Sequence, residues 1–201
     1  MRPTARTLLL GEGQPADAEA IIRETGLPCF IKPNRGGSSF GVSKITGKSQ
    51  LNDALEKARE EDEQVIIEEF LDGPEYTCGL VKFPDREMIF PLTQIVSRKE
   101  FFDYEAKYTA GMADEITPAK IPAERARRCR QLASRIYDLM DCRGIVRIDF
   151  IYSGGKFRFL ELNGVPGMTG ESIVPKQIRA YGMTEAEVYG MIIDRALGMK
   201  T

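Results

Sequence analysis

The sequence predicts an α+β or α/β protein. Signals for strands and helices alternate along the 201 residues, and two pairs of apolar segments are each joined by a short turn, as in antiparallel hairpins. The chain is 42% hydrophobic and 29% charged, which is enough apolar material for a buried core. This composition disfavours intrinsic disorder, and the length suits one or two domains.

The first part of the chain is expected to hold two helices and two strands. Proline, serine and glycine residues mark the helix ends, and the apolar spacing marks the buried faces. In chain order, the elements are a helix over 16–25, a strand over 29–32, a helix capped by Ser49 that runs to about Glu61, and a strand over 65–69. The turn Asp72-Gly73-Pro74 follows, and we place there the boundary between a subdomain of residues 1–74 and one of residues 75–201.

The second part is expected to hold two hairpins and three helices. In chain order, these are a hairpin over 76–83 and 87–96, a helix over 123–140, a hairpin over 145–152 and 156–163, a helix over 173–181 and a last helix. The last helix begins with a capping box formed by Thr184 and Glu187. The polar and aromatic segment Ser97–Pro118 is too long for an ordinary connection, and such segments often act as active-site lids.

The composition argues against several classes of function. Lysine and arginine number 28 against 30 acids, so the net charge of −2 disfavours general nucleic-acid binding. The absence of histidine excludes a Ser-His-Asp triad, a Cys-His pair and a histidine-ligated zinc. The four cysteines form no CxxC motif, which indicates a reducing cytoplasm. The apolar runs are too short for a membrane span or a signal peptide, so we expect a cytoplasmic protein without a membrane partner.

Two motifs match known signatures in a context that does not support them. Gly11–Ala16 fits the GxGxxA pattern, but a dinucleotide site needs an acid at the end of the next strand, where Lys32 stands. A linker before a helix explains this motif better. The arginines of the helix over 123–140 resemble a nucleic-acid patch, and a solvated helix face is the more common explanation.

Two segments that end strands of the first part of the chain could bind a nucleotide. Lys32 ends a strand, and the small residues up to Gly41 offer backbone amides that suit phosphate oxygens; the alternative is a flexible hairpin tip. Glu68-Glu69-Phe70-Leu71 closes another strand, and Glu75 follows the turn. Acids at a strand end can accept hydrogen bonds from an adenine amino group or ribose hydroxyls, and a solvated strand end is the alternative.

Polar residues interrupt the two apolar strands of the second hairpin. Arg147 and Asp149 share one face of the first strand, and Glu161 and Asn163 share one face of the second. The hairpin can bring these faces together. Carboxylate and amide oxygens are ligands that Mg²⁺ prefers, and a shared glutamate could bridge two ions. The alternative is the polar outer face of a half-buried sheet.

Two loops complete the set of candidates. Gly164–Ser172 leads into a helix whose N-terminus would attract a carboxylate or phosphate, with ordinary capping by Ser172 as the alternative. Phe101–Tyr108 carries aromatic residues and Lys107, and Lys99 lies just before it. A lysine on a closing lid could reach a transferring phosphoryl group, whereas a hairpin with hydrophobic anchors is the alternative.

In this order, the motifs resemble the D-alanine–D-alanine ligase family of the ATP-grasp superfamily. The matching segments are Ile31-Lys32-Pro33 with 37–42, Gly73-Pro74-Glu75, 102–108, 116–119, Arg147-Ile148-Asp149, Glu161-Leu162-Asn163, 166–169 and Ser172. Each motif alone is weak, but the full series is specific and covers nearly the whole chain. The resemblance implies an α+β ATP-grasp fold, with two subdomains whose mainly antiparallel sheets sandwich the nucleotide.

The resemblance also implies roles for single residues. Lys32 and Lys107 would hold phosphates of ATP, and Glu75 would meet the ribose. The adenine would contact Glu68, Glu69, Phe70 and Leu71. Two Mg²⁺ ions, for which Mn²⁺ can substitute, would be bound by Asp149, Glu161 and Asn163.

The implied reaction joins two D-alanines for peptidoglycan precursors through a D-alanyl phosphate. Arg147 and the Gly167 amide would stabilise the developing oxyanion, and Ser172 would hold the carboxylate of the second D-alanine. Ser38 and Tyr108 would form a hydrogen-bonded pair that closes the lid. The presence of Tyr108 in this lid favours an amine as the second nucleophile. The full-length protein would be a homodimer that binds no nucleic acid.

The chain also departs from the family pattern. Gly164 replaces a usual threonine, and Glu69 stands where many relatives have lysine. The family has an N-terminal domain before this region, so we expect weak or no ligase activity from the chain alone. Another ATP-grasp carboxylate–amine ligase, or a nucleotide-binding module without catalysis, remains the alternative.

Overall fold

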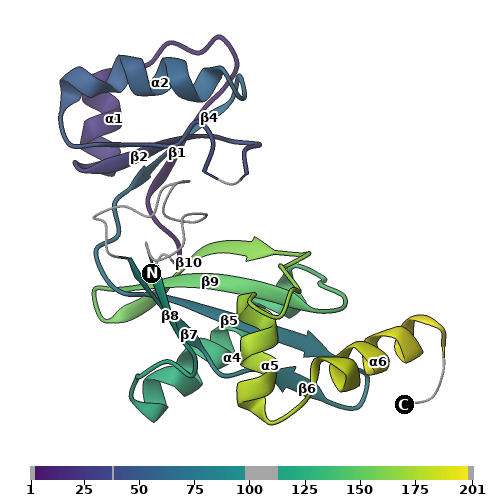
Figure 1. Ribbon diagram of the computed structural model, residues 1–201. Coiled ribbons are helices and arrows are strands. Elements are labelled where there is room, and N and C mark those ends of the chain that lie inside the picture. The colour runs from purple at the N-terminus through teal and green to yellow at the C-terminus, as the bar shows by residue number, and fades with distance from the viewer. Residues whose placement is uncertain (1–2, 38, 98–112, 199–201) are drawn as a thin grey trace. The chain divides into compact units, whose positions relative to one another are not determined.

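The computed structural model describes residues 3–37, 39–97 and 113–198 (Figure 1). Its contacts divide the chain into two compact units. Unit 1 contains the residues up to Asp72, and unit 2 contains Gly73–Val96 and the residues from Asp114 onward. All strand pairs in both units are antiparallel.

Unit 1 is a four-stranded sheet covered by helices. The strand order is β1-β4-β2-β3. The strands are β1 (Thr7–Leu10), β2 (Cys29–Pro33), β3 (Ser43–Ile45) and β4 (Val65–Glu69). The helices are α1 (Ala18–Thr25), the short 3₁₀ helix η1 (Lys48–Gln50) and α2 (Leu51–Arg59).

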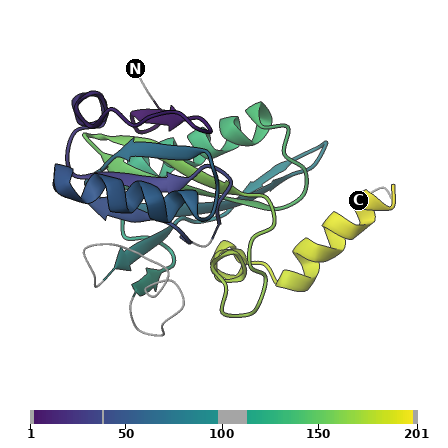
Figure 2. The same cartoon turned by 90° about the horizontal axis from the view of Figure 1, so that it is seen from above.

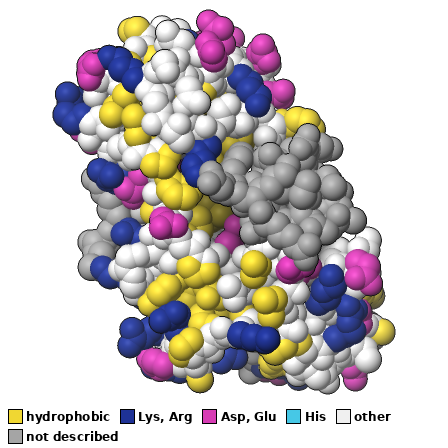
Figure 3. Space-filling view, turned by 60° about the vertical axis from the view of Figure 1, so that its left-hand side comes forward, with side chains coloured by type: hydrophobic (Ala, Val, Ile, Leu, Met, Phe, Trp, Pro, Cys, Tyr) yellow, Lys and Arg dark blue, Asp and Glu magenta, His cyan; other side chains and the backbone are white. Residues whose placement is uncertain are grey.

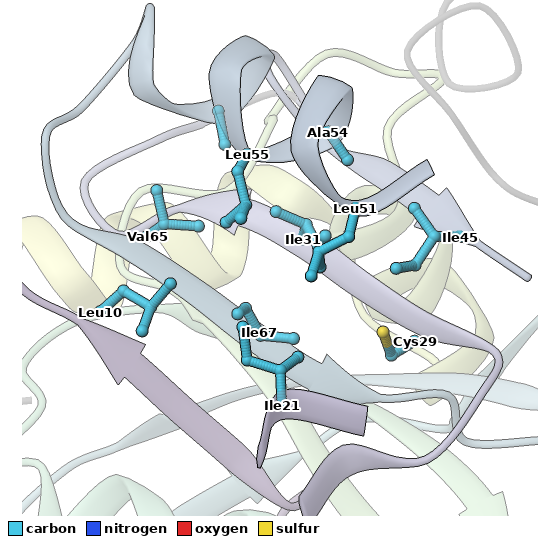
Figure 4. Packing of buried hydrophobic residues seen from close by; sticks show 11 residues of the cluster. Leu10, Ile21, Cys29, Ile31, Ile45, Leu51, Ala54, Leu55, Val65 and Ile67 are labelled. Atoms are coloured by element: carbon cyan, nitrogen blue, oxygen red, sulfur yellow. The ribbon is translucent and has the colours of Figure 1, made fainter. Parts of the chain in front are cut away.

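One face of this sheet forms the core of unit 1 with both helices. Alternate residues of β2 point inward, so Cys29 and Ile31 are fully buried while Lys32 lies on the opposite face. Ile67 of β4 packs with them against Ile21 of α1 and the apolar stripe of α2, as Figure 4 shows. The polar residues of β2 and β4 therefore share the outer face of the sheet.

The starts of both helices in unit 1 differ from the sequence prediction. The first helix begins at Ala18, because the side chain of Asp17 accepts hydrogen bonds from the amides of the first turn. Ser49 does not cap the second helix. It lies inside η1, where the side chain of Gln50 accepts from the amides of residues 46 and 47. The strands β1 and β3 were not predicted, since segments of three or four residues carry little periodicity.

Unit 2 is a six-stranded sheet with the order β10-β9-β5-β7-β8, and β6 also pairs with β5. The strands are β5 (Glu75–Lys82), β6 (Glu87–Ile89), β7 (Thr93–Ser97), β8 (Ala113–Ile116), β9 (Val146–Ser153) and β10 (Lys156–Asn163). The helices are α4 (Ala123–Leu139), α5 (Ile173–Tyr181) and α6 (Glu185–Ala196).

The two faces of this sheet carry different helices. Cys78 and Ile148 are opposite each other on β5 and β9 and pack with the buried face of α4. Val81 belongs to the other face, where it packs with Val174 of α5 and Val188 of α6. Figure 2 shows α6 extending away from its contact with α5. Residues of β5 and β9 that alternate with the α4-facing ones therefore share their face with α5.

Several elements of unit 2 match the prediction closely. Helix α4 ends one residue earlier than expected, α5 has the predicted bounds, and the capping box of α6 is confirmed by hydrogen bonds between Thr184 and Glu187. The hairpin of β9 and β10 turns at the two glycines between its strands. These elements have long periodic patterns and clear end signals.

Two segments of unit 2 differ in structure from the prediction. The first hairpin is split, because β6 pairs with residues 80–82 of β5 and β7 pairs with residues 75–77. Pro91 lies between β6 and β7, where a residue without an N–H fits an interrupted ladder. The expected lid also contains a strand, β8, whose short and polar sequence gives little strand signal. The rest of that lid lies outside the described residues.

The surface agrees with the balanced composition. Basic and acidic side chains are interspersed over the upper part of the view in Figure 3, which is unit 1. Within the described ranges, no helix combines the length and apolar character that crossing a bilayer requires.

Candidate active site

Four polar side chains gather on adjacent strands of unit 2. On β9, the guanidinium of Arg147 binds Asp149 with Nε–Oδ1 and Nη2–Oδ2 distances of 2.9 and 2.7 Å. On β10, the side-chain amide of Asn163 donates to Asp149 at 3.1 Å and to Glu161 at 3.4 Å. The register places Glu161 opposite Asp149 and Asn163 opposite Arg147. The structure therefore brings together the four residues predicted from the two strand patterns.

A β-bulge at Leu160 makes this arrangement. The hairpin turns through Gly154 and Gly155, both with positive φ, and Phe159 lies opposite Phe150 in the plain register of a two-residue turn. Without a change of register, Glu161 would lie on the α4 side of the sheet with Phe159. The register shifts by one residue between Phe159 and Glu161, so the remaining polar residues of β10 turn to the face of Asp149.

The carboxylate at the centre of this set is buried and compensated. Asp149 is 3% exposed, whereas the Glu161 side chain is about half exposed. Burial lowers the pKa of Arg147, but hydrogen bonds and negative charge from Asp149, with the charges of Glu161 and Glu75, outweigh burial and raise it. The guanidinium therefore stays charged in a largely dry environment and can act as a fixed positive group.

Strand β5 adds two residues to the same face. Glu75 and Thr77 lie on β5 opposite Ile151 and Asp149 of β9. The charge of Glu75 acts on Arg147, so this glutamate belongs to the electrostatic environment of the four residues. Thr77 is 1% exposed, and its hydroxyl has no hydrogen-bond partner among the described residues. Sequence reasoning missed Thr77; its alternation with Glu75 on the strand is the signal that could have found it.

The segment before α5 is held by its own polar groups. The Ser172 hydroxyl lies 2.8 Å from that of Thr169 and accepts a hydrogen bond from the Thr169 amide at 3.2 Å. Ser172 occupies the N-cap position of α5, as the sequence indicated, but its side chain makes no capping hydrogen bond, so the alternative explanation of ordinary side-chain capping is not supported. A Cβ on Gly167 would lie 2.9 Å from the Ser172 oxygen, which shows that these two residues are in close contact.

The nucleotide candidates of unit 1 lie on the outer face and end of its sheet. Lys32 of β2 forms an ion pair with Glu68 of β4 at 2.6 Å. Glu69 is held by the backbone and side chain of Arg6 at 2.9 and 2.6 Å. The Phe70 ring packs against another ring and lies 4.1 Å from the ammonium of Lys44, a cation that the sequence reasoning had not assigned. Leu71 follows Phe70 directly and is partly buried.

The glycine-rich segment is partly tied to its surroundings. The amide of Arg35 donates to the Asp62 carboxylate at 2.7 Å, and the amide of Phe40 donates to the carbonyl of Gly37. A carboxylate thus approaches a segment that contains no acid in its own sequence. Ser38, Lys107 and Tyr108, three further candidates, lie outside the described residues.

The two decoy motifs have structural explanations. Gly11–Ala16 begins with a turn in which the Gln14 amide donates to the Gly11 carbonyl and the Gln14 side chain accepts from the Gly11 amide. On α4, Arg127 and Arg128 bind Glu124, and all three side chains are more than half exposed. A turn and a solvated helix face account for both motifs.

Comparison with known proteins identifies the family of this chain. The family model described as D-ala D-ala ligase C-terminus matches residues 9–194. The chain belongs to this family. The D-alanine–D-alanine ligase of Phocaeicola vulgatus is 49% identical over 191 residues, which cover 94% of this chain and 59% of the relative. The chain thus spans about three-fifths of the length of the curated relatives it matches.

Solved structures place the fold in the same group. The VanG D-Ala:D-Ser ligase from Enterococcus faecalis superposes on this chain with a TM-score of 0.82 at 32% identity. The match covers 94% of this chain and 56% of the VanG chain. The Bacillus anthracis D-alanine–D-alanine ligase complexed with ATP has a TM-score of 0.78 at 28% identity, covering 96% of this chain and 60% of its own. The fold is therefore the α+β ATP-grasp fold of the D-alanine ligases, as the sequence predicted.

The family implies magnesium, and the donor set of this chain fits it. No group of three His, Cys, Asp or Glu side chains suited to a metal occurs among the described residues. The candidate set has two carboxylates, Asp149 and Glu161, and the amide of Asn163, all on one face. These are hard oxygen ligands once the Asn163 amide rotates its oxygen toward the acids. The unpartnered hydroxyl of Thr77 opposite Asp149 adds a further oxygen at the same place.

Proposed function

We propose that this chain is the nucleotide-binding and ligating part of a D-alanine–D-alanine ligase. The proposed reaction uses ATP to join two D-alanines for peptidoglycan precursors. The observation that carries the proposal is the register of β9 and β10, which gathers Arg147, Asp149, Glu161 and Asn163 on one face. A module that only binds a nucleotide has no need for an arginine fixed beside a metal-binding carboxylate.

In the proposed reaction, a carboxylate oxygen of the first D-alanine attacks the γ-phosphorus of ATP and ADP leaves. The amine of the second D-alanine then attacks the carbonyl carbon of the D-alanyl phosphate. The tetrahedral species expels phosphate and the amine loses a proton, leaving a peptide bond. Arg147 is already charged and fixed by Asp149, so it can stabilise negative charge without rearranging; the Gly167 amide is proposed as the second donor.

The remaining residues have binding roles in this proposal. Asp149, Glu161 and Asn163 would hold two Mg²⁺ ions, which neutralise phosphate charge when bound. Ser172 would hold the carboxylate of the second D-alanine. The adenine would contact Glu68, Glu69, Phe70 and Leu71, the ribose Glu75, and the phosphates Lys32 and Lys107, while Ser38 and Tyr108 would pair.

Two of these assignments require existing contacts to open. Lys32 must leave Glu68 to bind a phosphate, and the Ser172 hydroxyl must turn from Thr169 to bind a carboxylate. An ion pair between partly exposed side chains contributes only about 1 kcal/mol or less, so ligand charge can replace it.

We propose that the protein acts in the cytoplasm as a homodimer, in keeping with the family.

The test is phosphate release from ATP and Mg²⁺ in the presence of D-alanine. The chain is assayed alone and as a chimaera in which it replaces the matching segment of the Phocaeicola vulgatus ligase. We expect D-alanine-dependent release by the chimaera, with D-lactate and D-serine much less effective. Release only with another acid or amine would indicate a different ATP-grasp ligase. Nucleotide binding without release for any substrate would indicate a binding module.

The Glu161→Gln variant separates catalysis from binding. It keeps the size of the side chain and removes the charge opposite Asp149, so we expect nearly complete loss of turnover in the chimaera. Glu124→Gln is the matched control, because Glu124 is an exposed glutamate on α4 that binds only neighbouring arginines in the described structure. A Glu161→Gln chimaera with normal turnover would contradict the proposed metal site.

A further inference from the structure

Gln177 is a polar residue at the centre of an apolar interface. It is fully buried in α5, and its neighbours on the same helix, Val174 and Ile178, belong to the apolar cluster of α5 and α6. Its side-chain oxygen accepts from the Gly79 amide at 2.8 Å, and its nitrogen donates to the Thr77 carbonyl at 2.9 Å. The oxygen and the nitrogen of the Gln177 amide therefore both form hydrogen bonds. A buried polar side chain with all its groups bonded holds its neighbours in one arrangement.

These hydrogen bonds replace a missing piece of sheet. Strand β5 pairs with β7 at residues 75–77 and with β6 at residues 80–82, so the ladder is interrupted between them. The Gly79 carbonyl accepts from the Phe90 amide at 2.9 Å, but the Gly79 amide is bonded by the Gln177 side chain. Along a strand, the carbonyl of one residue and the amide two residues later point to the same edge. The Gln177 amide supplies one acceptor and one donor to the Thr77 carbonyl and the Gly79 amide, as a neighbouring peptide group would.

Gly79 permits this close approach. A Cβ at Gly79 would lie 2.6 Å from the Gln177 oxygen and 3.3 Å from a methyl group of Val174. A larger residue would therefore displace the Gln177 amide from its hydrogen bond with the Gly79 amide or push α5 away from β5. The nitrogen of Gln177 also donates to the Thr93 hydroxyl at 3.0 Å, and that hydroxyl lies 2.6 Å from the hydroxyl of Thr117. The contact thus joins α5 to β5, to β7 and to the segment that follows β8.

The two bridged residues lie beside the candidate catalytic residues. Thr77 is opposite Asp149 and Gly79 is opposite Arg147 in the pairing of β5 with β9. Helix α5 starts directly after Ser172, and five residues of helix rise by about 7.5 Å between that position and Gln177. The hydrogen bonds of Gln177 therefore fix the height and rotation of the start of α5 relative to Arg147 and Asp149.

We propose that Gln177 is a positioning residue for the second substrate. It sets where the segment Gly164–Ser172 stands relative to the charged residues of β9, and this inference rests on the proposed function. Because Ser172 is assigned to the carboxylate of the second D-alanine, a loose α5 weakens binding of that substrate and leaves ATP binding unchanged. Small displacements of positioning groups cost large factors in rate and binding.

The test compares Gln177→Met with Val188→Ala in the chimaera. Methionine keeps the volume and removes the hydrogen bonds of the amide. Val188 is fully buried in the same cluster but lies on α6, so its truncation loosens the interface and leaves the bridge to β5 in place. We expect Gln177→Met to raise the KM for the second D-alanine about tenfold. The KM for ATP should stay within about twofold, and Val188→Ala should change neither.

A second readout follows the bridge directly. Hydrogen exchange at the Gly79 amide should be faster in Gln177→Met than in Val188→Ala, because only the first variant removes its acceptor. If Gln177→Met does not fold, Gln177→Asn is used, which keeps the amide but is one methylene too short to bridge both groups. The same changes in KM and exchange are then expected.

The outcomes are distinguishable from those of the proposed function. A wild-type chimaera without D-alanine-dependent phosphate release refutes the proposed function, and this inference with it. An active wild-type chimaera whose Gln177 variants behave like Val188→Ala refutes only the positioning role. An equal rise of both KM values also refutes it, because that result indicates general loosening of unit 2.

Discussion

Arg147 and Asp149 stabilise each other, so we expect removal of either charge alone to lower the stability of the fold. The Asp149 side chain is 5% exposed and that of Arg147 is 21% exposed. Removing one partner leaves the other charge buried, which costs about 3 kcal/mol, whereas removing both charges costs less. We therefore expect Arg147→Met to lower the free energy of unfolding by about 3 kcal/mol, and Arg147→Met with Asp149→Asn to recover part of the loss.

Urea denaturation of the single and double variants measures this coupling. Arg135→Met is the control, since Arg135 is an exposed arginine of α4 and its loss should change stability by less than about 0.5 kcal/mol. Additive effects of the two substitutions would show that Arg147 and Asp149 do not depend on each other, and the assignment of Arg147 as a fixed charge would then fail.

Residue patterns in the sequence predicted part of the candidate site, but not all of it. A period of two placed Arg147 with Asp149 and Glu161 with Asn163, and the structure shows both pairs on one face. The pairing of Gln177 with the backbone of β5 could not be expected, because it joins residues about 100 positions apart through a local gap in the sheet. Polar side chains that mimic backbone leave no periodic signal.

The bulge in β10 makes a prediction at the scale of elements. Deleting Leu160 removes the extra residue of the bulge. Phe159 then still lies opposite Phe150, and Glu161 still lies opposite Asp149, because these pairs follow each other directly on β9. Inserting an alanine between Leu160 and Glu161 moves Glu161 away from Asp149 in either register. If the bulge is kept, Glu161 and Asn163 turn toward the α4 core, and if the strands pair without a bulge, Glu161 lies opposite Arg147 instead. We expect the chimaera to keep activity within about tenfold after the deletion and to lose more than about 100-fold after the insertion.

Phosphate release and circular dichroism of both variants provide the measurement. Circular dichroism checks that each variant still folds. An insertion variant with wild-type activity would show that the alignment of β10 with β9 does not determine the site. The bulge itself was beyond sequence analysis, since alternation alone puts Phe157, Phe159 and Glu161 on one face.

The start of α6 makes a second prediction at this scale. Hydrogen bonds from the backbone and side chain of Thr184 lower the pKa of Glu187 below its ordinary value of 4.5. A carboxylate with a lowered pKa stabilises the fold above its ordinary pKa, and this contribution disappears as the pH falls through the lowered value. Glu187→Gln should therefore lower Tm slightly at pH 7 and leave it unchanged in strong acid. Glu12→Gln, in the loop after β1, is the control, and a difference in Tm that persists in acid would contradict this explanation.

At the scale of the whole molecule, each unit has its own core. The cluster around Ile67 contains only residues of unit 1, and the cluster around Ile148 contains only residues of unit 2. Helix periodicity predicted the buried faces that the helices contribute to both cores, because those elements have strong apolar patterns. The buried residues of the strands were not assigned in advance. The units also carry separate reporters. Cys29 is buried in the first core, and Cys78 and Cys129 are buried in the second.

The cysteines allow the stability of the two cores to be followed separately. Burial raises the pKa of Cys78 to about 12 and raises the pKa of Cys129 further. The pKa of Cys29 is also raised, because the effect of burial outweighs that of a hydrogen bond with Thr25, which lowers it. These thiols should react with a thiol reagent only after their unit opens. Cys142 is partly exposed, so Cys142→Ser removes its background signal.

In that background, we expect Ile67→Ala and Ile148→Ala each to promote the labelling of cysteines in their own unit only. Each truncates a fully buried isoleucine and costs about 2–5 kcal/mol, which shifts the urea midpoint by about 1–2 M. Ile67→Ala should bring the labelling of Cys29 to lower urea and leave Cys78 and Cys129 unchanged, and Ile148→Ala should do the reverse. If either variant shifts all three cysteines together, the two cores unfold as one cooperative body, because opening of one core then carries the other with it.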